Sequence, residues 1–350
     1  MSATARLAEF AVKTSLDECP PEAVARVRLA ALDTLGVMLA GAGEPAARAV
    51  RAVARAEGGT ALCTVVGTRL VTAPGWAALA NGTAGHAHDF DDTNFALMGH
   101  PSAPLLATCL AAGEAEMVDG RALVTAYVVG FEISTTLGCA LNPEHYTRGW
   151  HATSSIGTLG CAAAAARLLR LDVTQTRHAL AIAASHASGL KENFGSMTKP
   201  YHAGHAARCG VLAAQLAREG LTASETALEG RQGYVAAFDR DKSFGERRAV
   251  SPRQAQSRQR HSPKELDIGA HPVKGTDCDD IGSRCPAQEV GNPDRGVHIE
   301  TAVESGDIAA RRLGDAVGNG GVAFFNRQFL QPRSAISKTL AGMHQGVLEY

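Results

Sequence analysis

The residues best suited to chemistry lie between positions 86 and 102. This segment holds three histidines and three aspartates, namely His86, His88 and His100 with Asp89, Asp91 and Asp92. The other residues of the segment are mostly small or apolar, and none is a lysine. Because an unpaired buried charge is costly, a core segment would avoid such groups unless they were used. The composition therefore indicates a pocket in which protons are moved or a metal ion is held.

Two further polar clusters interrupt an otherwise apolar sequence. They lie at 146–154, with Arg148, Trp150 and His151, and at 197–208, with Lys199, His202, His205 and Arg208. Lys199 precedes Pro200, which predicts extended backbone at the start of a helix. The free N–H groups and the positive end of the helix dipole at such a position favour carboxylates.

Each group also has a purely structural interpretation. Asp91 and Asp92 could cap a helix or hold a loop, and Lys199 could be a solvated lysine. A lone histidine in an apolar helix is usually a core residue with satisfied hydrogen bonds, the expectation for His178 and His186. Three arginines are expected to be charged residues on the flanks of helices, namely Arg167, Arg170 and Arg208. The functional interpretation depends on all three polar clusters falling at junctions between apolar helices.

The elements that must position these clusters are predicted to be mostly α-helices. Apolar residues recur at helical spacing over 22–39, 44–57, 74–85, 102–118, 121–139, 153–170, 174–187 and 202–219. The spacing of Asp172 with Gln175, and of Thr222 with Glu225, is that of a capping box at a helix start. Only the run 61–66 has a β-like pattern. The sequence therefore predicts a mostly α protein built on one large helical domain.

Composition limits the classes of function. The 350 residues are 45% apolar with a formal net charge of −1, which gives no reason to expect nucleic acid or an anionic membrane surface as a partner. The eight cysteines form no C-x-x-C pair, a usage typical of free thiols in a reducing cytosol. The first residues lack the apolar core of a secretory signal, and no apolar run approaches the length of a membrane span. We therefore expect a cytoplasmic protein.

The chain divides near residue 238. Residues 1–238 are rich in Ala, Leu, Val and Gly, whereas 239–350 carry a higher proportion of charged residues and few apolar runs. We expect a helical catalytic domain in the first part and an atypical region in the second, incomplete or poorly ordered. The helix predicted at 153–170 is apolar almost all round, which places it in the centre of a bundle or in a subunit interface. A homodimer and a monomer explain that pattern equally well.

The three clusters together resemble the MmgE/PrpD family. The matching residues are Gly-His-Ala-His-Asp-Phe-Asp-Asp-Thr at 85–93, Gly-His-Pro-Ser at 99–102, Gly-Trp-His-Ala-Thr at 149–153 and Thr-Lys-Pro-Tyr-His-Ala-Gly-His-Ala-Ala-Arg at 198–208. The resemblance covers about residues 5–238. It implies a lyase or isomerase without metal or other cofactor that acts on a small polycarboxylate. It also implies a large helical domain, a smaller α+β lid and usually a homodimer.

The resemblance also implies a set of site residues and a reaction. By motif position, Asp89, Thr93, His100, His151 and Lys199 match residues that line the family's active site. The default reaction is dehydration of 2-methylcitrate to 2-methyl-cis-aconitate in propionate catabolism, which needs a base, an acid and groups that bind carboxylates. We assign the base to Asp89 or His151, the acid to His100, the carboxylate clamp to Lys199 with Arg148, and substrate orientation to Thr93 and His202.

The C-terminal part departs from the family pattern. The resemblance leads us to expect a Lys-x-Tyr-Pro motif and a later tyrosine there, but only His-Pro-Val-Lys at 271–274 comes near. A divergent lid, a truncation or a shifted reading frame would each produce this departure. Two alternatives to a lyase follow: a degenerate relative that binds carboxylates without turnover, and a metal-dependent hydrolase that uses His88, Asp91 and Asp92.

Overall fold

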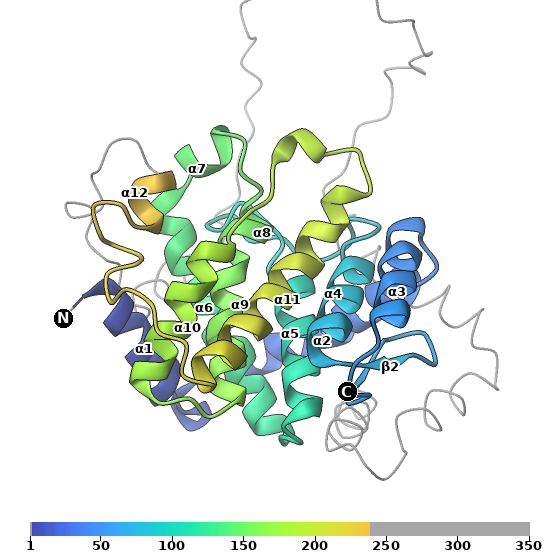
Figure 1. Ribbon diagram of the computed structural model, residues 1–350, viewed down its shortest axis with the longest axis horizontal. Helices are drawn as coiled ribbons and strands as arrows, with labels where there is room; N and C mark the ends of the chain where they lie inside the picture. The colour runs from blue at the N-terminus through green and yellow to red at the C-terminus, as the bar shows by residue number, and fades with distance from the viewer. Residues whose placement is uncertain (1, 239–350) are drawn as a thin grey trace, which may run out of the picture.

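Long runs of Ala, Leu and Gly, punctuated by Pro, Asp and Gly at their ends, fold as the predicted helices. The computed structural model describes residues 2–238, which form a mostly α-helical body (Figure 1). The helices are α1 (Ala3–Lys13), α2 (Pro21–Gly41), α3 (Pro45–Glu57), α4 (Pro74–Gly85), α5 (Ser102–Ala115), α6 (Gly120–Leu141), α7 (Glu144–Thr147), α8 (Ala152–Ser155), α9 (Gly157–Leu168), α10 (Val173–His186), α11 (Thr198–Arg218) and α12 (Tyr234–Phe238), with short 3-10 turns η1 (Leu16–Glu18) and η2 (Lys191–Asn193).

Most of these bounds agree with the sequence predictions to within a few residues. The capping box at Asp172 is present, because its side chain accepts from the Gln175 backbone N–H at 2.8 Å and the Gln175 side chain accepts from the Asp172 N–H. The capping box predicted at Thr222 and Glu225 is wrong, since turns and not a helix follow Thr222. The β-like run contributes β1 (Cys63–Thr64), which pairs antiparallel with β2 (Val71–Thr72).

Two further predictions are corrected at the helices nearest the polar clusters. The predicted helix 153–170 is divided at Ile156 into α8 and α9. Helix α11 begins at Thr198, four residues earlier than predicted, so Lys199 lies in its first turn and not in extended backbone. Pro200 is tolerated there because the first turn of a helix has N–H groups without intrahelical acceptors.

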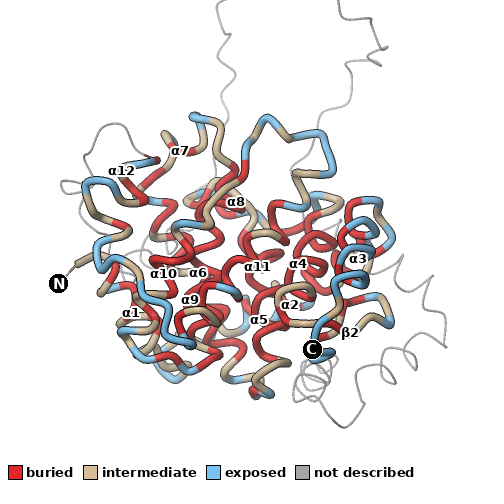
Figure 2. The backbone as a smooth tube through the Cα atoms, in the orientation of Figure 1, coloured by how far each residue is buried: buried red, intermediate tan, exposed pale blue. Residues whose placement is uncertain are grey.

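Helix α9 lies at the centre of the body, as its all-round apolar sequence predicts. The buried residues concentrate on α9 and on α4, α5, α6 and α11 around it (Figure 2). Close approach depends on glycine: a Cβ on Gly160 of α9 would meet the Gly130 carbonyl of α6, and one on Gly210 of α11 would meet Cys161 of α9. The small residues of the sequence are therefore contact points between helices.

Helices α4 and α11 cross at another close contact between glycines. A Cβ on Gly82 would lie 2.7 Å from the Gly204 Cα, and a Cβ on Gly204 would meet the Leu79 carbonyl and the Thr83 N–H. The crossing brings the C-terminal end of α4 and the N-terminal part of α11 together. Those ends carry two of the three polar clusters.

Helix α6 is long and apolar enough to cross a membrane, contrary to the expectation that no segment would be. In the folded protein, however, 72% of the most apolar 18-residue stretch of α6 is buried. The helix packs on α9 and α5, so its apolar residues belong to the core (Figure 1). The predictions made for 239–350 lie outside the described residues.

Candidate active site

The loop between α4 and α5, residues 86–101, carries the first polar cluster and is fastened to α6. The Asn94 side chain accepts from the Leu97 N–H at 2.8 Å and donates to Thr135 at 3.3 Å. From the end of α6, the Asn142 amide donates to the Leu97 carbonyl at 2.7 Å. Leu97 is fully buried. These hydrogen bonds tie the loop to α6 and so to the helical body.

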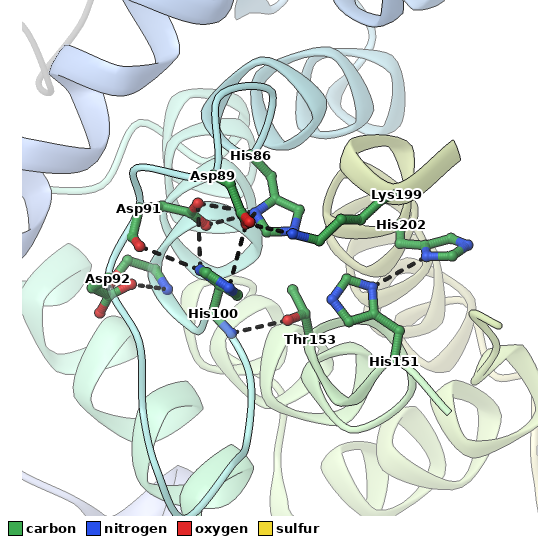
Figure 3. A network of polar contacts seen from close by, with 10 residues as sticks. His86, Asp89, Asp91, Asp92, His100, His151, Thr153, Lys199 and His202 are labelled. Carbon is green, nitrogen blue, oxygen red and sulfur yellow. Dashed lines mark hydrogen bonds and ion pairs between the residues drawn. The ribbon is translucent and has the colours of Figure 1, made fainter. Parts of the chain in front are cut away.

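Asp89 lies where all three polar clusters meet. Its carboxylate is 2.5 Å from the Lys199 ammonium of α11 and 3.5 Å from Nε2 of His100 (Figure 3). The backbone of Asp89 is left-handed, with φ of 58°. Aspartate is one of the few residues other than glycine that tolerates this conformation, and such residues often mark functional sites. Its side chain is 53% exposed and therefore accessible to a ligand.

Asp91 lies on the buried side of the same cluster. Its side chain is fully buried, and both carboxylate oxygens accept from Nδ1 of His86, at 2.9 and 3.0 Å. Nδ1 of His100 lies 3.5 Å from the same carboxylate and 3.2 Å from the Asp91 carbonyl oxygen. Burial alone would raise the pKa of Asp91, but the contacts with His100 and His86 outweigh it and hold that pKa below its usual range.

Asp92 has the structural role that the sequence left open. Its carboxylate accepts from the Ser102 N–H at 3.0 Å and from the Ser102 hydroxyl at 2.6 Å. Ser102 is the first residue of α5, so Asp92 satisfies a free donor at that helix end. The Asp92 carboxylate is therefore bonded to the start of α5 and not to the histidines of the cluster.

His151 and His202 form the other side of the site. Gly189 accepts from the His151 N–H at 2.9 Å, and the Nδ1 atoms of His151 and His202 are 3.1 Å apart (Figure 3). The Phe194 ring packs edge-on against His151 with centroids 4.8 Å apart, and the Lys199 ammonium lies 5.3 Å from the Phe194 ring centre. Both histidines are buried, at 2% and 5% exposure.

The histidines differ in charge state because their neighbours differ. Burial, with nearby His86, His202 and Lys199, lowers the pKa of His151 to about 2, and burial with His205 and His86 lowers that of His202 to about 4. Burial also acts against the charged form of His100, but the contact with Asp91 prevails and raises its pKa. The site therefore favours the protonated form of the imidazole at His100 and the neutral form at His151 and His202.

The structure brings most of the predicted site residues together, but not all. Asp89, His100, His151, Lys199 and His202 converge from three elements (Figure 3). Thr93 is exposed and lies outside this network of contacts. Arg148 is also outside it, because its guanidinium donates to the Phe238 carbonyl at 2.5 Å. The predicted carboxylate clamp therefore reduces to Lys199.

The ligand set predicted for a metal-dependent hydrolase is not assembled. His88 faces the Ala40 carbonyl at 3.4 Å and Glu44 at 3.6 Å, and Asp92 is bound to Ser102. Four other donors, from His86, Asp89, Asp91 and His100, lie within 4.8 Å of one another. They contact each other, and the Lys199 ammonium supplies positive charge at Asp89. We interpret them as a hydrogen-bonded acid–base cluster.

The sequence placed His86 and Asp91 in the first polar cluster but assigned neither a role in the lyase site. Their i, i+5 spacing spans the end of a helix and the start of a loop, so no regular periodicity predicts that they meet. Thr153 is a third: its hydroxyl accepts from the His100 N–H at 2.9 Å. The only signal in the sequence was the density of acid and base groups between 86 and 102.

The arrangement suits acid–base chemistry on an anion. The Lys199 ammonium can bind a carboxylate, His100 can donate a proton, and Asp89 can accept one. The buried neutral imidazoles of His151 and His202 offer hydrogen bonds without repelling a cationic partner. The charges of Asp89 and Lys199 offset each other until an anion competes for the ammonium.

Comparison with known proteins finds relatives of the described helical domain. Residues 5–247 match the model of the MmgE/PrpD N-terminal domain. The human cis-aconitate decarboxylase is 39% identical over 170 residues, which are 47% of this chain and 35% of the human protein. The mouse enzyme is 36% identical over 215 residues (59% and 43%), and the Aspergillus terreus enzyme 29% over 238 residues (66% and 48%).

The region that the family model matches contains all three polar clusters and every helix described above, apart from the first two residues of α1. The chain spans less than half the length of the curated relatives it matches. The match of the family model covers well over half of this chain. The chain therefore belongs to the MmgE/PrpD family, through its N-terminal helical domain.

Proposed function

We propose that the chain carries the acid–base site of a lyase that acts on a small tricarboxylate, and that the reaction is decarboxylation of cis-aconitate. The observation that carries the proposal is the meeting of Asp89, His100 and Lys199 at one point. The substrate is supported by the relatives, which are named cis-aconitate decarboxylases. The 2-methylcitrate expected from the sequence becomes the second candidate.

The first step is binding. A substrate carboxylate competes with Asp89 for hydrogen bonds from the Lys199 ammonium, which lies in the first turn of α11. Phe194 lies beside both Lys199 and His151, so it shields this position from water. Charge-assisted hydrogen bonds strengthen where water is excluded.

The second step is bond cleavage. The bond between the departing carboxylate and its carbon breaks, carbon dioxide leaves, and the electron pair is delocalised over the unsaturated acid that remains. His100 then gives its proton to carbon and recovers one from solvent. The trianion and one proton thus yield carbon dioxide and an unsaturated dicarboxylate. This reaction needs an acid but no base.

Dehydration of 2-methylcitrate would use the same groups differently. Asp89 would remove a proton from carbon while His100 protonated the departing hydroxyl. The two reactions therefore make different demands on Asp89. We propose that Asp89 serves chiefly to hold Lys199 and His100 in place, as decarboxylation requires.

The test is a substrate panel with the whole chain. Purified protein is incubated with cis-aconitate, citrate or 2-methylcitrate, and products are followed by NMR, with His100→Asn as the inactive control. Carbon dioxide release from cis-aconitate supports the proposal, and dehydration of 2-methylcitrate would replace it. Binding without turnover would favour the degenerate relative. That the protein is a cytoplasmic homodimer stays a prediction, and light scattering on the purified chain tests the dimer.

A further inference from the structure

We propose that Asp91 is a positioning residue for His100: its buried carboxylate, anchored by His86, keeps His100 protonated and its ring fixed. This inference rests on the proposed function only in one respect, namely that the proton of His100 is the one given to the substrate carbon. Asp91 and His86 are almost completely buried, at 4% and 1% exposure, so we do not expect either to contact substrate.

Geometry ties His100 to Asp91 at two atoms. Nδ1 of His100 faces both the carboxylate, at 3.5 Å, and the carbonyl oxygen of Asp91, at 3.2 Å. The His100 backbone is held by Thr153 of α8. With one ring nitrogen directed at Asp91, the other, Nε2, is directed at Asp89, on the accessible side of the site. The proton to be delivered is therefore carried on Nε2.

His86 anchors Asp91 through one ring nitrogen. Nδ1 of His86 donates to both carboxylate oxygens, whereas Nε2 is buried and has no hydrogen-bond partner among the described residues. Because Nδ1 contacts both oxygens, the Asp91 carboxylate is fixed in one orientation. In that orientation it also faces Nδ1 of His100.

The other charged groups around His100 are less well placed. Asp89 is half exposed and paired with Lys199 of α11, so solvent and the ammonium weaken its field. Asp92 is turned to Ser102, and Asp33 of α2 has a pKa raised by burial and by the charge of Asp91. The His86 ring is tilted against His100 with centroids 4.7 Å apart, and His151, just before α8, stacks on His86 at 5.7 Å. Asp91 is the buried carboxylate in contact with His100, where the local dielectric is low.

The decisive experiment is a titration of His100 in the ligand-free protein. Imidazole carbon and nitrogen shifts are followed by NMR in labelled protein, with the His100 signal assigned from its loss in His100→Asn. In Asp91→Asn we expect the pKa of His100 to fall from above the ordinary histidine value to below it, because burial then acts alone. An unchanged pKa would overturn the proposal.

The matched control is Asp92→Asn. It removes one charge from the neighbouring position and keeps an acceptor for Ser102, so it should shift the His100 pKa much less than Asp91→Asn does. Equal shifts would mean that loop charge in general, and not Asp91, acts on His100. The role of His86 in anchoring Asp91 is tested with two further variants. His86→Asn keeps a hydrogen-bond donor near the position of Nδ1 and should leave the His100 pKa as in the wild type, whereas His86→Ala removes the donor and should change that pKa.

Two features keep the test decisive. If Asp91→Asn does not fold, the wild-type protein suffices: the Asp91 carboxyl carbon shift should change at the midpoint of the His100 titration, and a flat response contradicts the proposal. The titration also needs no turnover. A protein that shows the expected shifts but converts no substrate would refute the proposed function and leave this inference standing.

Discussion

Lys199 and His100 contact the same carboxylate, but we expect their loss to affect different kinetic constants. Lys199→Ala removes a charged partner of the substrate carboxylate and should raise KM by about tenfold or more. Lys191→Ala is the matched control, because Lys191 lies over the Tyr146 ring, away from Asp89. Steady-state assays with cis-aconitate measure the effect. An unaltered KM in Lys199→Ala would remove the lysine from the binding site.

His100→Asn should instead lower kcat by about 100-fold or more with a smaller change in KM, since a proton donor acts in the transition state. Because the pKa of His100 is raised, the wild-type rate should be highest at low to neutral pH and fall as pH rises through that pKa. A pH–rate profile tests this. A rate that increases over the same range would identify His100 as a base.

Asp89 allows the two candidate reactions to be separated. Asp89→Asn keeps a residue that tolerates the left-handed backbone, whereas Asp89→Ala adds strain there. We expect Asp89→Asn to retain measurable decarboxylation but to abolish dehydration of 2-methylcitrate, which needs a base. Comparing the two activities in this one variant is the measurement. A complete loss of decarboxylation at unchanged substrate affinity would give Asp89 a direct part in that reaction.

At this scale the sequence predicted residue types better than contacts. Asp89 and His100 could be proposed because a concentration of acid and base groups without lysine, as in residues 86–102, is unusual between apolar helices. Lys199 could be proposed because it precedes Pro200 at a predicted helix start. Thr93 and Arg148 lie outside the contacts that join the other site residues, since motif position does not determine which way a loop side chain points. The contact between His86 and Asp91 was missed because it crosses the end of α4, where helical periodicity stops.

At the scale of elements, the site depends on how closely α4 and α11 approach. Gly204→Ala would press a methyl group against the Leu79 carbonyl and the Thr83 N–H, so we expect a loss of about 1–3 kcal/mol in the free energy of unfolding. Urea unfolding measures it. Gly36→Ala on α2 is the control: its Cβ meets nothing within 4 Å, so this change should be stabilising. Equal effects would show that the crossing is not tight.

Helices were predictable where local signals agreed. Apolar periodicity and a proline or an aspartate at the first turn located α2, α3 and α10 closely. Thr222 and Glu225 have the spacing of a cap but no amphipathic run after them, so the local signal had no packing to support it. The early start of α11 was missed because Pro200 was taken to mark a boundary, although the first turn accepts proline.

For the whole molecule, buried neutral histidines predict sensitivity to acid. The pKa values of His145 and His202 are about 4, lowered chiefly by burial, and that of His151 is about 2. Each lies below its unfolded value, so the unfolded chain binds more protons as pH falls from about 6.5 to about 4. Stability should therefore decrease over that range, measured as urea midpoints at several pH values.

His145 is the residue that isolates this effect, because it lies outside the site and bonds Ser155 at 2.7 Å. His145→Gln keeps a polar group near Nε2 but cannot titrate. We expect a shallower dependence of stability on pH in this variant, by up to about 1.4 kcal/mol per pH unit. An identical slope in the variant would mean that other groups govern acid unfolding.

The close contact between Lys199 and Asp89 has a consequence for how the protein meets its ligand. A lone ammonium on a side chain that is only 17% exposed would be poorly solvated and would attract any small anion. With the Asp89 carboxylate already beside it, the ammonium is neutralised in the ligand-free protein, and only a ligand with several negative groups gains by exchanging partners. Selectivity for polyanions over chloride or acetate would then arise from the resting state itself.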